Sequence, residues 1–81
     1  MSAKVYLVLS SVNKKPMQIA SILKTKAGVI TVDVLDGYPN LIAILEAESR
    51  QELAELTAQA IDSVETMTKS LQLLPVMLYE Q

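Results

Sequence analysis

The 81-residue sequence contains no cysteine, histidine, tryptophan or phenylalanine. Without cysteine there is no disulfide framework, no thiolate metal site and no cysteine nucleophile. Without histidine the chain lacks the commonest general base and the commonest transition-metal ligand. Carboxylates also bind Ca²⁺ or Mg²⁺, but no spaced acidic run of the D-x-D-x-D-G type is present. We therefore expect a protein that is not an enzyme and holds neither a metal ion nor a cofactor.

Long hydrophobic runs and an excess of basic residues are missing too. Every apolar run is far shorter than the roughly 20 residues that span a bilayer. No signal-peptide pattern precedes the first strand-like segment, so we expect a cytoplasmic protein that does not bind membranes. The net charge is −2 and the isoelectric point is about 4.9. DNA- and RNA-binding proteins usually carry a basic surface, so we expect no direct nucleic-acid binding by this chain alone.

The N-terminal half of the chain has the pattern of a strand, a helix and a second strand. Residues 4–10 are rich in β-branched and apolar residues, as in a buried strand. A helix is expected to begin near Pro16, with an apolar face that extends to Ala27, and to end at Gly28 in a left-handed cap. Residues 29–35 alternate, which predicts a strand with Ile30, Val32 and Val34 on one face.

The C-terminal half repeats this order after a turn at residues 36–40. Residues 41–45 are apolar on both faces, as in a central strand. Ser49 and Glu52 have the spacing of a capping box, so a second helix is expected from there to about residue 62. Residues 68–74 alternate between apolar and polar side chains, and Pro75 is expected to end this last strand.

The expected order β-α-β-β-α-β predicts one α+β domain over residues 1–81, with a ferredoxin-like fold. In this fold an antiparallel four-stranded sheet has the order 4-1-3-2, with two helices on one face. The first and third strands are then central, and their apolar side chains occupy both faces. The face without helices would expose an apolar patch, which monomers avoid. We therefore expect a homodimer that associates through this face, in the manner of dimeric α/β barrels.

Several short motifs, taken in order, resemble the effector-binding RAM domain of the Lrp/AsnC (leucine-responsive, feast/famine) regulators. They are Tyr6-Leu7-Val8, Gly28-Val29, Gly37-Tyr38-Pro39-Asn40-Leu41-Ile42-Ala43, Glu46-Ala47 and Val64-Glu65-Thr66-Met67-Thr68. The family usually has Tyr-Asp where this chain has Pro39-Asn40, and Gly-Val where it has Ser63-Val64. Because no helix-turn-helix segment is present, the chain resembles a stand-alone form of this domain.

The resemblance implies a sensor of small effectors, typically amino acids, that acts in transcription regulation through protein–protein contacts. Its expected partners are further copies of itself, a small-molecule effector and full-length Lrp/AsnC regulators. In the family, effectors lie between dimers, against the turn between strands two and three and the approach to strand four. The corresponding residues in this chain are Asp36, Gly37, Tyr38, Asn40, Thr66 and Thr68.

Each of these residues also has a purely structural explanation. Asp-Gly is favoured in tight turns, Tyr38 beside Pro39 can shield the turn, an asparagine can cap its own loop, and threonine is common in edge strands. Two other functions remain open. A signal-peptide-binding chaperone resembling NapD of nitrate reductase maturation would bind a peptide on its sheet, whereas a small dimeric α/β-barrel enzyme would need catalytic groups in a cleft. Only Tyr6, Asn13, Tyr38 and Asn40 are candidates for such groups, and no pair of them forms a recognisable acid–base constellation.

Overall fold

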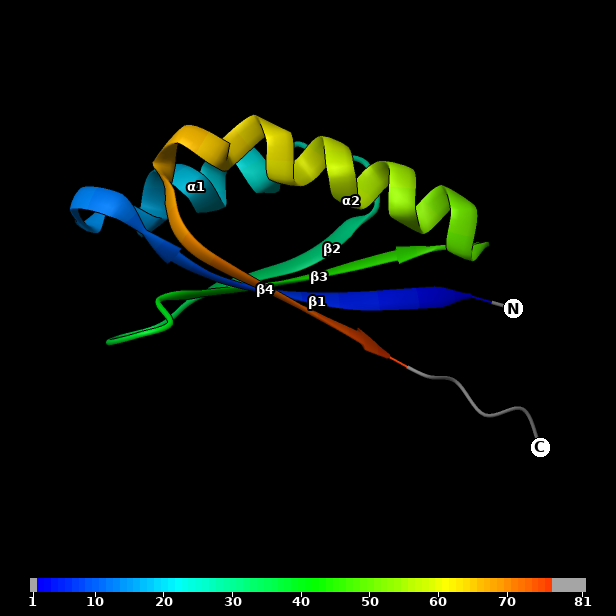
Figure 1. The fold of residues 1–81 in the computed structure, drawn as a ribbon, viewed down its shortest axis with the longest axis horizontal. Coiled ribbons are helices and arrows are strands. Elements are labelled where there is room, and N and C mark those ends of the chain that lie inside the picture. Colours follow the sequence, from blue (N-terminus) through cyan, green and yellow to red (C-terminus); the bar gives the residue numbers. More distant parts are fainter. Residues whose placement is uncertain (1, 77–81) are drawn as a thin grey trace.

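The computed structural model describes residues 2–76 and has four strands and two α-helices in the order β1-α1-β2-β3-α2-β4. The strands are β1 (Ala3–Ser11), β2 (Val29–Val34), β3 (Leu41–Ala47) and β4 (Thr68–Val76), and the helices are α1 (Pro16–Leu23) and α2 (Arg50–Val64). The antiparallel sheet has the order β2-β3-β1-β4, and both helices lie on one of its faces (Figure 1). The predicted ferredoxin-like fold and its strand order are therefore confirmed. No helix of the described residues is long and apolar enough to cross a membrane.

The core lies between the helices and the odd-numbered positions of the two central strands. In β1, Val5, Leu7 and Leu9 are buried, and β3 buries every second residue from Leu41 to Ala47. Such an alternation is expected because successive side chains of a strand point to opposite faces. The helices contribute the buried side chains Ile19, Ala20, Leu23, Thr57, Ala60 and Val64.

The predicted start of α2 matches the structure, whereas the predicted end of α1 does not. The Ser49 hydroxyl accepts a hydrogen bond from the Glu52 backbone N–H at 3.1 Å, so α2 begins at the predicted cap. Helix α1, in contrast, ends at Leu23, well before Gly28, and Ala27 is exposed. The Thr25 backbone N–H and hydroxyl both donate to the Ile22 carbonyl, which closes the last turn early. Gly28 does adopt the left-handed conformation expected of it, with φ of 88°.

Gly28 provides a first stability prediction, because a side chain there would be both strained and obstructed. A Cβ atom at this position would lie 2.8 Å from Leu56 Cδ1 and 3.4 Å from the Glu46 carbonyl oxygen. We expect Gly28→Ala to lower the free energy of unfolding by about 1–3 kcal/mol, measured by urea denaturation. Gly37→Ala is the control: Gly37 also has a positive φ, of 105°, but a Cβ atom there would meet no other atom within 4 Å. An equal loss in both variants would contradict a role for the Leu56 contact.

Two details of the sequence prediction are wrong, and both concern the edge strands. The pairing of β2 with β3 shifts between Val29 and Thr31, which places Ile30 in an irregular position where it is 52% exposed. The alternation of the sequence predicted that Ile30 and Val32 lie on the same face. That prediction is wrong for Ile30, which does not lie on the helix-covered face. Strand β4 continues to Val76, and Pro75 pairs with Val5 instead of ending the ladder. An edge strand tolerates proline because only one of its sides needs hydrogen-bond donors.

The face of the sheet opposite the helices is largely apolar at its centre. Tyr6 pairs with Ile44 on one side and Leu74 on the other, and Val8 pairs with Ile42 and Gln72. Directly paired residues project from the same face, so these side chains form adjacent rows across the sheet. At the rim of this face, Lys4 Nζ lies 3.6 Å from Glu46 Oε2. We call this surface the open sheet face; it is the face that the sequence predicts to bind a second copy.

Candidate functional site

The turn between β2 and β3 is held against the end of β1 by Asn40. Its backbone N–H donates to the Leu9 carbonyl at 3.1 Å, and its own carbonyl accepts from the Leu35 N–H at 2.9 Å. The side chain is buried, with Oδ1 accepting from the Ser11 N–H at 2.9 Å and Nδ2 donating to the Ser11 hydroxyl at 3.2 Å. Asn40 therefore points into the protein, and a ligand would have to compete with Ser11 for its amide.

The rest of the turn projects from the molecule. Asp36, Gly37, Tyr38 and Pro39 are exposed, and Tyr38 most clearly so, at 68%. The positive φ of Gly37 allows the chain to reverse there without steric conflict. Because Asn40 fixes one end of the turn, the Tyr38 ring is presented next to the sheet from an anchored loop.

Tyr38 and Pro39 form one wall of a cleft of about 520 Å³ at this end of the sheet. The remaining lining comes from the two strands at the other side of the cleft, β1 and β4, and consists of Val8, Ser10, Ser70, Leu71 and Gln72. The lining combines an aromatic ring and aliphatic carbons with hydroxyl and amide groups. Such groups both donate and accept hydrogen bonds, which suits a small polar molecule with an apolar part.

The two predicted threonines lie elsewhere. Thr66 is exposed in the short 3-10 helix η2 (Glu65–Met67). Thr68 is half-buried at the start of β4, and its hydroxyl donates to the Val64 carbonyl at 2.7 Å. Within one chain, therefore, neither threonine lines the cleft beside Tyr38. A site that combines the turn of one copy with the threonines of another remains a prediction.

Sequence reasoning missed the strand residues of the cleft, above all Ser10, Ser70 and Gln72. Ser10 pairs directly with Ser70, and Val8 pairs with Gln72. The polar positions of β4 were visible as an alternation, but their place beside the turn depends on the pairing of β4 with β1. Among the residues that the structure describes, no three acidic side chains gather into a group that could hold a metal ion.

Comparison with known proteins identifies the fold but no family. No family model matches the sequence, and no curated protein matches it. Three solved structures are similar. The crystal structure of PH0061 superposes with a TM-score of 0.81 at 12% identity, and the match covers 99% of this chain but 55% of that one. A hypothetical protein, PHS023 from Pyrococcus horikoshii, gives a TM-score of 0.82 at 15% identity, over 98% of this chain and 93% of the other.

The third structure, TTHA0845 from Thermus thermophilus, has a TM-score of 0.80 at 15% identity, and the match covers 98% of both chains. This chain thus spans about half the length of PH0061 and nearly the full length of the other two. At such low identity the likeness concerns the path of the backbone. The chain shares its whole fold with these three proteins.

Proposed function

We propose that this protein is a small-effector-binding module of the Lrp/AsnC type that works as a homo-oligomer. The single observation that supports it most is the cleft between Tyr38 and the strand pair β1–β4, with its mixed apolar and hydrogen-bonding lining. The order of sequence motifs around the same turn, from Gly37 to Ala43, supports the same proposal. The proposed effector is an amino acid, and regulation passes through contacts with full-length regulators of the family.

The open sheet face supports the oligomeric part of the proposal. Tyr6 and Leu74 are 37% and 44% exposed there, next to half-buried Val8, Ile42 and Ile44. Association through such a surface stabilises by roughly 25 cal/mol for each Å² of apolar area removed from water. Because Val8 belongs both to this face and to the cleft, a second copy on the face would lie beside a bound effector. Effector binding and assembly are then expected to influence each other.

Calorimetry with each of the twenty amino acids, combined with light scattering on the full chain, tests this proposal. We expect at least one amino acid to bind at millimolar concentration or below and to change the average mass of the protein. Ser70→Ala should weaken that binding about two- to tenfold, because one hydrogen bond to the ligand is lost. Ser21→Ala is the matched control, since the Ser21 hydroxyl is exposed on α1 and bonds only its own helix.

Two outcomes would contradict the proposal. If no amino acid binds, the effector role fails. If the wild-type protein is monomeric at micromolar concentration, the homo-oligomer fails, and a peptide-binding role of the NapD type becomes the better explanation.

A further inference from the structure

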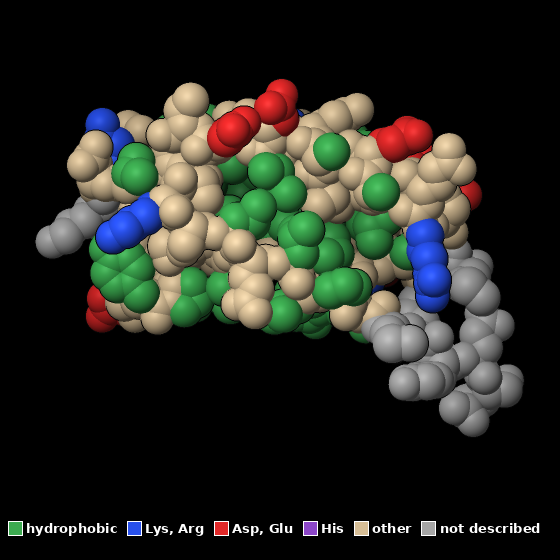
Figure 2. Space-filling view, in the orientation of Figure 1, with side chains coloured by type: hydrophobic (Ala, Val, Ile, Leu, Met, Phe, Trp, Pro, Cys, Tyr) green, Lys and Arg blue, Asp and Glu red, His purple; other side chains and the backbone are tan. Residues whose placement is uncertain are grey.

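A second cleft lies on the helix-covered side of the sheet, between α2 and β4. It measures about 330 Å³ and is lined mainly by Val5, Leu53, Ala54, Ala58, Ile61 and Leu73. Figure 2 shows hydrophobic side chains gathered along this part of the surface, with cationic side chains near both ends. We call it the helix cleft. It shares no lining residue with the cleft beside Tyr38, which we call the Tyr38 cleft. A ligand in the helix cleft therefore does not depend on the proposed effector site.

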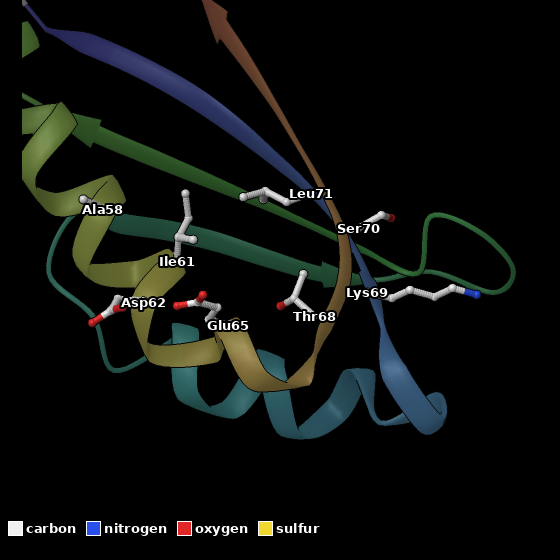
Figure 3. Close-up of a pocket in the computed structure, with 8 residues that line it drawn as sticks. All are labelled: Ala58, Ile61, Asp62, Glu65, Thr68, Lys69, Ser70 and Leu71. Carbon is white, nitrogen blue, oxygen red and sulfur yellow. The ribbon is translucent and has the colours of Figure 1, made fainter.

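The helix cleft exists because the helical layer does not reach over the outermost strand. Leu71 and Leu73 pair with the buried residues Leu9 and Leu7 and therefore point toward the helices. Even so, they are 38% and 44% exposed. Farther along, Ile61 and Leu71 point toward each other between α2 and β4, as Figure 3 shows. The apolar floor thus continues along the strand and stays open to a ligand.

The two ends of the helix cleft differ in their balance of charges. Arg50 lines one end, at the first turn of α2. Among the side chains that the structure describes, the only ion pair joins Lys4 and Glu46, so no described carboxylate lies within 4 Å of the Arg50 guanidinium. Beyond the Ile61 end, Asp62 and Glu65 line an adjoining hollow, and Lys69, which lines it too, extends away from them (Figure 3). The N-terminal end of a helix also favours a negative charge. An anionic group is therefore attracted to one end and repelled from the other.

Thr57 places a polar group directly beneath the wall of this apolar cleft. The residue is 7% exposed, and its hydroxyl oxygen is buried without a hydrogen-bond partner. Because that oxygen is inaccessible, Thr57 lines the cleft with carbon atoms. Threonine in a helix populates two side-chain rotamers, and rotation about the Cα–Cβ bond exchanges the hydroxyl with the methyl group. A ligand with a polar atom at this depth would provide the hydrogen-bond partner that the Thr57 hydroxyl lacks within the protein.

We infer that the helix cleft binds a small monocarboxylic acid with an apolar body, its carboxylate at Arg50 and its chain directed toward Ile61. The apolar lining accepts the chain, and the guanidinium supplies a charged hydrogen bond, which is stronger than a neutral one. The acidic rim at Asp62 and Glu65 excludes a second carboxylate at the far end. A hydroxyl or oxo group partway along the chain would bond to Thr57.

A titration of the ¹⁵N-labelled full chain with straight-chain carboxylates tests this inference. With octanoate, we expect shifts of the backbone amides of Leu53, Ala58 and Leu73. Affinity should rise about twofold for each methylene from butanoate to octanoate. Full burial of a methylene would give a larger increase, but the cleft is open and buries each methylene only in part. Octanedioate and octan-1-ol should both bind more weakly than octanoate, the first because of the acidic rim and the second because it lacks the charge.

Three variants and one control identify the groups involved. Arg50→Gln should weaken octanoate at least threefold and leave octan-1-ol unchanged, whereas Ala58→Trp should prevent the binding of both by filling the cleft. Lys24→Gln, which removes an exposed cation just after α1, should change neither. At least one octanoate with an oxo group on carbons four to six should bind more tightly than octanoate, and Thr57→Val should remove that advantage.

The inference is overturned if millimolar octanoate shifts none of the three amides, or shifts those of the open sheet face instead. It is also overturned if octan-1-ol binds as tightly as octanoate, or if Lys24→Gln weakens octanoate as much as Arg50→Gln. Because the amides of the two sites differ, loss of amino-acid binding at the Tyr38 cleft would leave this result unaffected.

Discussion

Replacing Val8 with lysine is expected to give a folded protein that no longer self-associates, whereas replacing its neighbour Leu7 is expected to abolish the fold. Leu7 is fully buried beneath the helices, and an unpaired lysine there loses its hydration without a partner. Its cost of several kcal/mol is comparable with the whole stability of a small domain, about 5–15 kcal/mol. Val8 lies on the open sheet face, beside Ile42, where a lysine remains hydrated in a monomer but conflicts with a second apolar sheet.

Circular dichroism and light scattering on the two variants separate these effects. Val8→Lys should melt cooperatively and have half the mass of the wild type or less. Val8→Thr is the control, because it keeps the size and β-branching of the side chain and adds no charge. Should Val8→Lys keep the wild-type mass, the open sheet face would not be the interface.

Asn40→Ala is expected to lower the free energy of unfolding by about 2–4 kcal/mol, which corresponds to a loss of about 8–30 °C in melting temperature for a domain of this size. The substitution removes both bonds to Ser11, which is itself 2% exposed. The Ser11 N–H is then left buried without an acceptor. Since Asn40 also fixes the turn, the Tyr38 wall of the cleft would lose its anchor.

Ser11→Ala and Gln59→Ala are the companions for this measurement. Ser11→Ala removes the hydroxyl but keeps the N–H bond to Asn40, so its loss should be clearly smaller. Gln59 is an exposed amide on α2, and Gln59→Ala should leave the melting temperature nearly unchanged. If Asn40→Ala instead keeps its stability and loses amino-acid affinity, the residue is a ligand group and its bonds to Ser11 contribute little.

The fold was predictable because local signals agreed with one another. The apolar runs at residues 4–10 and 41–45 and the cap at Ser49 each specify an element or its end. The end of α1 was predicted too late because of local bonds from Thr25 to the Ile22 carbonyl, whereas the errors in the edge strands occur where a tertiary contact decides. The alternation of Ile30, Val32 and Val34 fits a regular strand, yet the pairing with β3 shifts at Val29. Likewise, Pro75 ends a central strand but not an edge strand.

The candidate site was harder to predict than the fold, for a physical reason. Asn40 and Ser11 are 29 positions apart, so no local pattern reveals that the asparagine amide points inward. The wall opposite Tyr38 comes from β1 and β4, and the register between these two strands places the polar residues of β4 beside the turn. The turn itself was identified from its residues, whereas the surface it faces required the structure.

The irregularities of the two outer strands limit how the molecule can aggregate. An exposed strand edge is a template on which further strands can be added without end. Here β2 is interrupted at Val29, the pairing of β4 with β1 shifts between Ser10 and Ser11, and Pro75 removes one backbone donor near the end of β4. Such interruptions discourage edge-to-edge growth, which leaves the open sheet face as the surface through which we propose that copies associate. If the same face of two copies packs together across a two-fold axis, the contact closes as a finite particle and does not propagate into a fibre.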